Sequence, residues 1–162
     1  MSRLPPWPPL PEVVRTLMEE LQGEQFALDG PRESPPRPWD LCSLAGAIED
    51  AVWLWLDEVA QWLNRTYGWT DEQVIPACWH QHEAIAHDLA ALAFSRIDVY
   101  SASSAAFVGR WHADMEDFHR RMTLSLGLNS PCRHSHHGES PPRYTAEMAN
   151  RAMSDRTSQT GE

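Results

Sequence analysis

The chain has 162 residues, of which 42% are hydrophobic, as expected for one globular domain with tails. It carries 13 basic and 23 acidic residues, and the formal net charge of −10 argues against a general nucleic-acid binder or a basic membrane-surface protein. No apolar run approaches the roughly 20 residues that a membrane span needs, and the proline-rich N-terminus does not fit a signal peptide. Three cysteines without an export signal favour a reducing compartment, so we expect a cytoplasmic protein.

Proline content and charge divide the chain into three parts. Residues 1–38 hold nine of the 13 prolines and are predicted to form a flexible arm. Residues 39–126 combine five arginines with 13 acids, a net charge of −8, and are predicted to form a helical domain. Residues 127–162 have four arginines and four acids, and are predicted to form a polar C-terminal arm.

Hydrophobic residues recur at helical spacing in four segments, and no segment shows the alternation typical of a strand. The predicted helices cover 11–22, 41–67, 82–100 and 104–125. Because the connections between the last three are short, they are expected to pack as antiparallel neighbours. The sequence therefore predicts an all-α fold, a small antiparallel bundle of three main helices plus a short N-terminal helix.

Several polar residues and glycines predict where helices begin and end. Asp40 is expected to cap the second helix, and Gly68 and Gly127 are expected to end the second and fourth. Thr70 and Gln73 have the spacing of a capping box, which predicts a short turn after the second helix.

The chain contains eight tryptophans, a high number for this length. Buried tryptophans bring a large apolar surface, so we expect Trp62, Tyr67, Trp79 and Trp111 to organise the core. Exposed tryptophans would instead favour contact with another protein, because tryptophan is enriched at interaction hot spots.

A C-x-H-x-H pattern occurs twice, before the third predicted helix and after the fourth. It covers Cys78 to His82 and Cys132 to His136. In an up-down bundle these two segments can meet at one end, and thiolate and imidazole are the preferred ligands of Zn²⁺. The sequence therefore predicts a structural zinc site formed by Cys78, His82, Cys132 and His136.

Other interpretations of the same residues stay open. His80, His134 and His137 are substitute ligands within the two segments. Alternatively, Cys78 is a small buried hydrophobic residue, His82 caps the third helix, and the segment 132–137 is a polar histidine-rich tract.

A second pattern, E-x-x-H, lies on the fourth predicted helix at Glu116 and His119. Di-iron carboxylate bundles use two such motifs, whereas the third helix offers only Glu83 and His87 at a different spacing. We therefore expect His112, Asp114, Glu116 and His119 to form a solvated face. The sequence contains no G-x-S-x-G, no P-loop and no G-x-G-x-x-G.

The acidic residues of the middle segment allow two interpretations. They form no long run, which is typical of a solvated surface that keeps the protein soluble. A strongly anionic surface can also imitate a phosphate backbone and occupy a DNA-binding partner. An acidic DNA mimic or anti-restriction type of inhibitor is therefore an alternative function.

Short motifs in the middle of the chain resemble a family of small actinobacterial proteins, often encoded on plasmids, phages and integrated elements. The motifs are Trp62–Tyr67, Ile75–His82 with the pattern I-P-x-C-W-x-x-H, and Trp111-His112 one helix later. The resemblance covers about residues 52–125 and implies an all-α domain in a mobile element, but no activity. Glu83 departs from the family, where proline is frequent. The absence of lysine among the 13 basic residues agrees with a high-GC host.

Together these observations predict a non-enzymatic accessory protein of an actinobacterial mobile element. It is expected to bind another protein or a second copy of itself, without direct binding to nucleic acid or membranes. A metal-dependent enzyme that uses histidines and carboxylates of the third and fourth helices is a further alternative.

Overall fold

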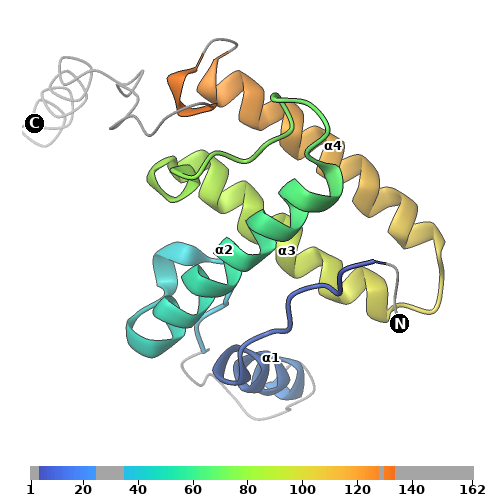
Figure 1. The fold of residues 1–162 in the computed structure, drawn as a ribbon. Coiled ribbons are helices and arrows are strands. Elements are labelled where there is room, and N and C mark those ends of the chain that lie inside the picture. Colours follow the sequence, from blue (N-terminus) through green and yellow to red (C-terminus); the bar gives the residue numbers. More distant parts are fainter. Residues whose placement is uncertain (1–3, 25–34, 128–129, 134–162) are drawn as a thin grey trace, which may run out of the picture.

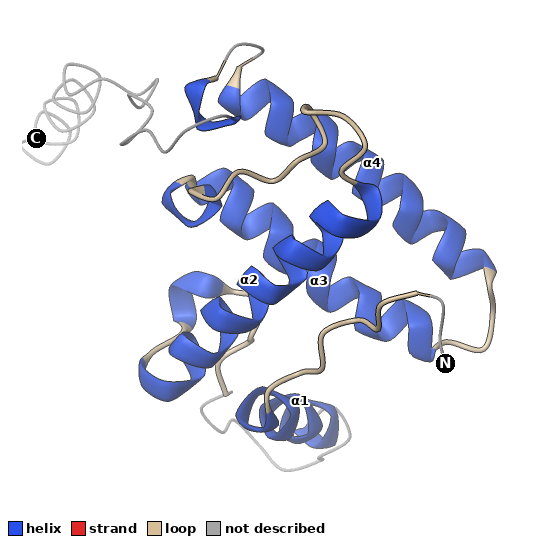
Figure 2. Ribbon diagram, viewed as in Figure 1, coloured by secondary structure: helices blue, strands red, loops and turns tan. Residues whose placement is uncertain are grey.

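A computed structural model describes residues 4–24, 35–127 and 130–133 (Figure 1). These residues form four α-helices, α1 (Glu12–Glu24), α2 (Gly46–Tyr67), α3 (Glu83–Ser101) and α4 (Ala106–Leu126). Three short 3₁₀-helices accompany them, η1 (Leu41–Ser43), η2 (Trp79–Gln81) and η3 (Pro131–Arg133). The described part contains no strand, so the predicted all-α fold is confirmed (Figure 2). Each helix in this part is too short or too polar to cross a bilayer.

The helices α3 and α4 run antiparallel and side by side, and α2 crosses α3 (Figure 1). The indole N–H of Trp111 on α4 donates to the carbonyl of Leu92 on α3 at 3.0 Å. An ion pair between Arg121 and Asp88, at 2.8 Å, also joins these two helices. This antiparallel pairing places the start of α3 and the end of α4 at the same end of the molecule.

The core is rich in tryptophan and lies between α2, α3 and α4. Trp62, Trp79 and Trp111 are buried and Tyr67 packs against them, as predicted. Burying such large apolar side chains contributes roughly 1.5–3 kcal/mol each, which allows a small domain to build a core. Phe107, by contrast, belongs to the hydrophobic stripe of α4 but is exposed, because it lies in the first turn beyond the end of the core.

The N-terminal segment is not a separate arm in the part that the structure describes. The Trp7 ring lies against the rings of Trp55 and Trp62, with centroids 6.4 and 4.9 Å apart. The indoles of Trp55 and Trp62 donate to the carbonyls of Pro8, at 3.2 Å, and Pro5, at 3.1 Å. Residues 4–10 therefore pack against α2 in the structure, a contact that the prediction of a flexible arm did not include. We call residues 4–10 the N-terminal strap.

The helix ends agree with the predictions except at the start of α2. Leu41 begins a 3₁₀ turn instead of the predicted long helix, and Leu44 is extended, with φ −84° and ψ 151°. Gly46 has φ +60°, so the regular helix begins only there. Gly68 ends α2 as predicted, and its N–H donates to the carbonyl of Asn64. A Cβ at this position would lie 2.5 Å from that carbonyl oxygen, so only glycine fits without a shift of the backbone.

Candidate metal centre

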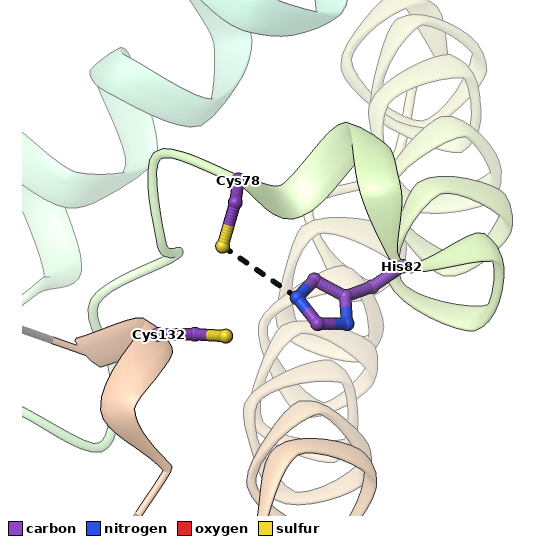
Figure 3. A group of neighbouring side chains, drawn as sticks. All are labelled: Cys78, His82 and Cys132. Atoms are coloured by element: carbon purple, nitrogen blue, oxygen red, sulfur yellow. Dashed lines mark hydrogen bonds between the residues drawn. The ribbon is translucent and has the colours of Figure 1, made fainter. Parts of the chain in front are cut away.

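Three of the four predicted metal ligands lie close together at one end of the molecule. Cys78 precedes η2, His82 precedes α3, and Cys132 lies in η3, which follows α4. Their side chains point toward one another (Figure 3). His82 and Cys132 are 50 positions apart in the sequence, and the antiparallel pairing of α3 with α4 brings them to the same end of the molecule.

The distances suit a metal ion. The Cys78 Sγ and His82 Nε2 atoms are 3.5 Å apart, and the ligand atoms of all three residues lie within 4.8 Å of one another. A tetrahedral Zn²⁺ with its usual bond lengths places sulfur about 3.5 Å from nitrogen and about 3.8 Å from a second sulfur. The distance between Cys78 Sγ and His82 Nε2 therefore already equals the sulfur–nitrogen distance around a tetrahedral zinc ion.

The loop that carries Cys78 is held by contacts with two helices. The side chain of Asn64 on α2 accepts from the backbone N–H of Ile75 at 2.8 Å and donates to its carbonyl at 2.9 Å. From α4, the Thr123 hydroxyl donates to the Glu72 carbonyl at 3.3 Å. The loop therefore has a defined position relative to both helices before any ligand binds.

The predicted capping box contributes to the same loop. The side-chain oxygen of Gln73 accepts from the backbone N–H of Thr70 at 3.2 Å, and the N–H of Gln73 donates to the carbonyl of Thr70 at 2.9 Å. This turn, predicted from the spacing of the two residues, is confirmed. It reverses the chain after α2 and leads it toward Cys78.

A second tight turn brings Cys132 to the centre. Gly127 follows α4 with φ +86°, a conformation that favours glycine. Ser130 is buried, and its hydroxyl accepts from the backbone N–H of Cys132 at 3.4 Å. Both thiols are buried, with 1% of Cys78 and 6% of Cys132 exposed. Together with the half-buried His82 they form a group of three donors that is mostly shielded from solvent.

The remaining predicted ligands are not in this group. His136, the fourth ligand of the prediction, lies outside the described residues, as do His134 and His137. His80 is exposed, and its ring lies edge-on to that of Trp79 at 6.0 Å. In the parts of the chain that are described, Cys78, His82 and Cys132 are the one group of three or more potential metal ligands.

The E-x-x-H residues of α4 do not form a second site, and one of them corrects a prediction. His119 is buried, with 7% exposed, whereas Glu116 is exposed. Burial lowers the pKa of His119, and the nearby carboxylate of Glu116 only partly opposes this effect. His119 lies four positions after Met115 and three before Met122, so it shares the buried side of α4 with them and does not belong to a solvated face.

Sequence reasoning missed a second cysteine-histidine pair and an aromatic cluster. Cys42 Sγ lies 3.7 Å from His87 Nε2, but both residues are exposed and they are 45 positions apart. The guanidinium of Arg96 lies over the rings of Trp7 and Tyr100, at 4.1 and 3.8 Å. Arg96 and Tyr100 are four positions apart on α3, a helical spacing that the sequence analysis overlooked. No local spacing connects Arg96 with Trp7 or Cys42 with His87, so no sequence pattern indicates those contacts.

Comparisons of the chain with known protein families, curated proteins and solved structures find no match. We therefore infer the metal that this centre prefers from its donor atoms alone. Two thiols and one imidazole are soft or borderline ligands, a set that suits zinc better than calcium or magnesium.

Proposed function

We propose that this protein is a non-enzymatic, protein-binding accessory protein of an actinobacterial plasmid, phage or integrative element, with a structural zinc ion. The motifs shared with small actinobacterial mobile-element proteins support the setting. The observation that carries the binding function is the exposure of tryptophan in a chain that already has a tryptophan core. The cluster of Cys78, His82 and Cys132 supports the zinc ion.

The zinc ion has a structural task in this proposal. It joins the loop before α3 to the segment after α4, two parts of the chain that are distant in sequence. His136 supplies the fourth ligand, four residues after Cys132, with the same spacing as between Cys78 and His82. Buried thiolates and a complete ligand set are typical of structural zinc, whereas a catalytic ion keeps one position open.

The metal content of the purified chain tests the zinc site. We expect about one zinc ion per chain by mass spectrometry, because four cysteine and histidine ligands complete a structural site. Substitutions Cys78→Ser and Cys132→Ser should each remove it. The matched control is Cys42→Ser, which removes an exposed thiol outside the group and should leave the zinc content unchanged.

The same measurement separates a structural from a catalytic ion. His136→Ala should lower zinc affinity by 10-fold or more, whereas His80→Ala should leave it unchanged. Full zinc affinity in His136→Ala would contradict His136 as the fourth ligand. Full affinity also in the triple variant His134→Ala/His136→Ala/His137→Ala would contradict the closed site and favour an open position, as in a metal-dependent enzyme. Absence of zinc from the native chain would contradict the proposed metal site altogether.

Binding of another protein is supported by large apolar side chains on the surface. Trp69 follows α2 and is 83% exposed, and Trp39 and Phe107 are also exposed. Tryptophan brings a large apolar surface and is enriched at interaction hot spots, so these side chains are candidate contacts for a partner. The indole of Trp69 is oriented by a hydrogen bond to the carbonyl of Thr66 at 3.1 Å.

Sedimentation velocity tests this function with the full chain, alone and mixed with proteins from a host that carries the element. We expect a stoichiometric complex with a second copy or with one defined host protein. Trp69→Ala should weaken the complex at least 10-fold while leaving the helical circular dichroism unchanged. A strictly monomeric chain without any stoichiometric partner, or a complex indifferent to Trp69→Ala, would contradict the proposal.

A further inference from the structure

A groove separate from the metal centre lies between α2 and η2. It is a shallow depression of about 430 Å³ that is largely open to solvent, so it can hold one side chain of a partner against its wall and does not enclose a whole ligand. We call it the Trp53 groove; its lining residues are Trp53, Leu54, Asp57, Trp79 and His80.

The walls of the Trp53 groove are apolar and preformed. The indoles of Trp53 and Trp79 are stacked, with ring centroids 5.5 Å apart and an interplanar angle of 28°. Trp79 is almost completely buried, so its ring fixes the orientation of the half-buried Trp53. Leu54, which is 71% exposed, continues the apolar surface along α2. A flat ligand group can therefore lie against this wall without rearrangement of the protein.

One carboxylate is held in place at the groove. The Trp79 indole donates to Oδ1 of Asp57 at 3.3 Å, and the Gln61 amide donates to Oδ2 at 2.7 Å. A carboxylate has about four acceptor positions, so two remain for a ligand. The two donors orient Asp57 beside an aromatic wall, where a negative charge attracts a cation.

We propose that the Trp53 groove binds an arginine side chain of a partner protein. A guanidinium is planar, so it can stack on the indole of Trp53 while its N–H groups donate to the carboxylate of Asp57. A lysine ammonium supplies the charge but neither the plane nor the fork of donors.

Charge supports an external, cationic partner. The helix α2 carries four acids, Glu49, Asp50, Asp57 and Glu58, against one arginine, and the whole chain has a net charge of −10. Such a surface attracts a basic segment and accelerates its association. This inference rests on the proposed protein-binding function and adds to it a place on the fold and a chemistry for the partner.

Nuclear magnetic resonance of the full chain tests the groove with a defined probe. N-acetyl-arginine amide should shift the indole N–H signals of Trp53 and Trp79 in a saturable way, with a dissociation constant in the millimolar range. N-acetyl-citrulline amide has the same shape without the charge and should bind at least 10-fold more weakly. Asp57→Asn should weaken arginine binding at least 10-fold, whereas Asp50→Asn, which removes the same charge from α2 outside the groove, should not.

Three results would overturn the proposal. They are no saturable shift, equal shifts by arginine and citrulline, and full binding by Asp57→Asn. The chain's own C-terminal arginines are tested by the variant Arg143→Gln/Arg151→Gln/Arg156→Gln. If the Trp53 and Trp79 signals of this variant move without added ligand, the occupant is the chain itself and not a partner.

Failure of the groove is distinguishable from failure of the proposed function. A groove that does not bind arginine leaves the zinc content and the Trp69-dependent complex unchanged. A chain without zinc and without a stoichiometric partner would instead contradict the proposed function, whatever the arginine probe does.

Discussion

Replacing Trp7 with alanine should destabilise the protein by about 3 kcal/mol, because the N-terminal strap is part of the core. Trp7 makes edge contacts with Trp55, Trp62 and Trp111, at centroid distances of 6.4, 4.9 and 6.3 Å. Its ring also faces the guanidinium of Arg96 at 4.1 Å.

The magnitude follows from these contacts. Truncating a buried aromatic residue to alanine costs about 3–5 kcal/mol. Aromatic pairs contribute roughly 0.5–1.5 kcal/mol each beyond area burial, and a cation–π contact about 0.5–2 kcal/mol. Trp7 is only partly buried, and its indole N–H has no hydrogen-bond partner among the described residues, so the lower end of the range applies.

Urea unfolding followed by far-ultraviolet circular dichroism measures this loss without depending on tryptophan fluorescence. Trp7→Phe should lower the free energy of unfolding by less than Trp7→Ala, because phenylalanine keeps an aromatic ring among Trp55, Trp62 and Trp111. The control Trp69→Ala removes a tryptophan that is largely in water and should change the free energy of unfolding by less than about 0.5 kcal/mol. A similarly small change for Trp7→Ala would refute the packing of the strap onto the core.

Three further predictions concern stability and the metal centre. Because burial lowers the pKa of His119, the unfolded chain binds its proton more readily. The stability that neutral His119 provides is therefore present above the unfolded pKa of about 6.5, and declines as the pH falls toward the folded value. Urea unfolding at a series of pH values measures this effect. His119→Phe should reduce the decline of the free energy of unfolding with falling pH, and an unchanged dependence on pH would contradict the prediction. Asn64→Ala leaves both backbone groups of Ile75 without their partner and should cost about 1–3 kcal/mol in chemical unfolding. It should also weaken zinc binding, because the same loop carries Cys78; zinc affinity equal to that of the native chain would argue against this coupling. Gly68→Ala places a Cβ 2.5 Å from a backbone oxygen and should lower the melting temperature, which a calorimetric scan can show.

Local sequence patterns were sufficient for α1, α3, α4 and the end of α2, and for the cysteine-histidine pair of the metal centre. Helical spacing predicts α1, α3 and α4 to within a few residues, because an amphipathic stripe depends only on neighbours three and four positions apart. Gly68 and Gly127 end their helices as predicted. The pair Cys78 and His82 is also local, because one turn of chain separates the two side chains.

The sequence by itself determined the all-α class, the positions of most helix ends and the residue types that can bind zinc. The predicted meeting of Cys132 with this pair was an inference from helix pairing, and the tertiary structure confirmed it. Only the tertiary structure decided that the strap packs on the core and that α2 begins at Gly46. The physical reason is the range of the interactions. Helical periodicity is set by hydrogen bonds and side chains within one turn, whereas the metal centre, the Trp7 cluster and the Trp53 groove each depend on the packing of segments that are distant along the chain.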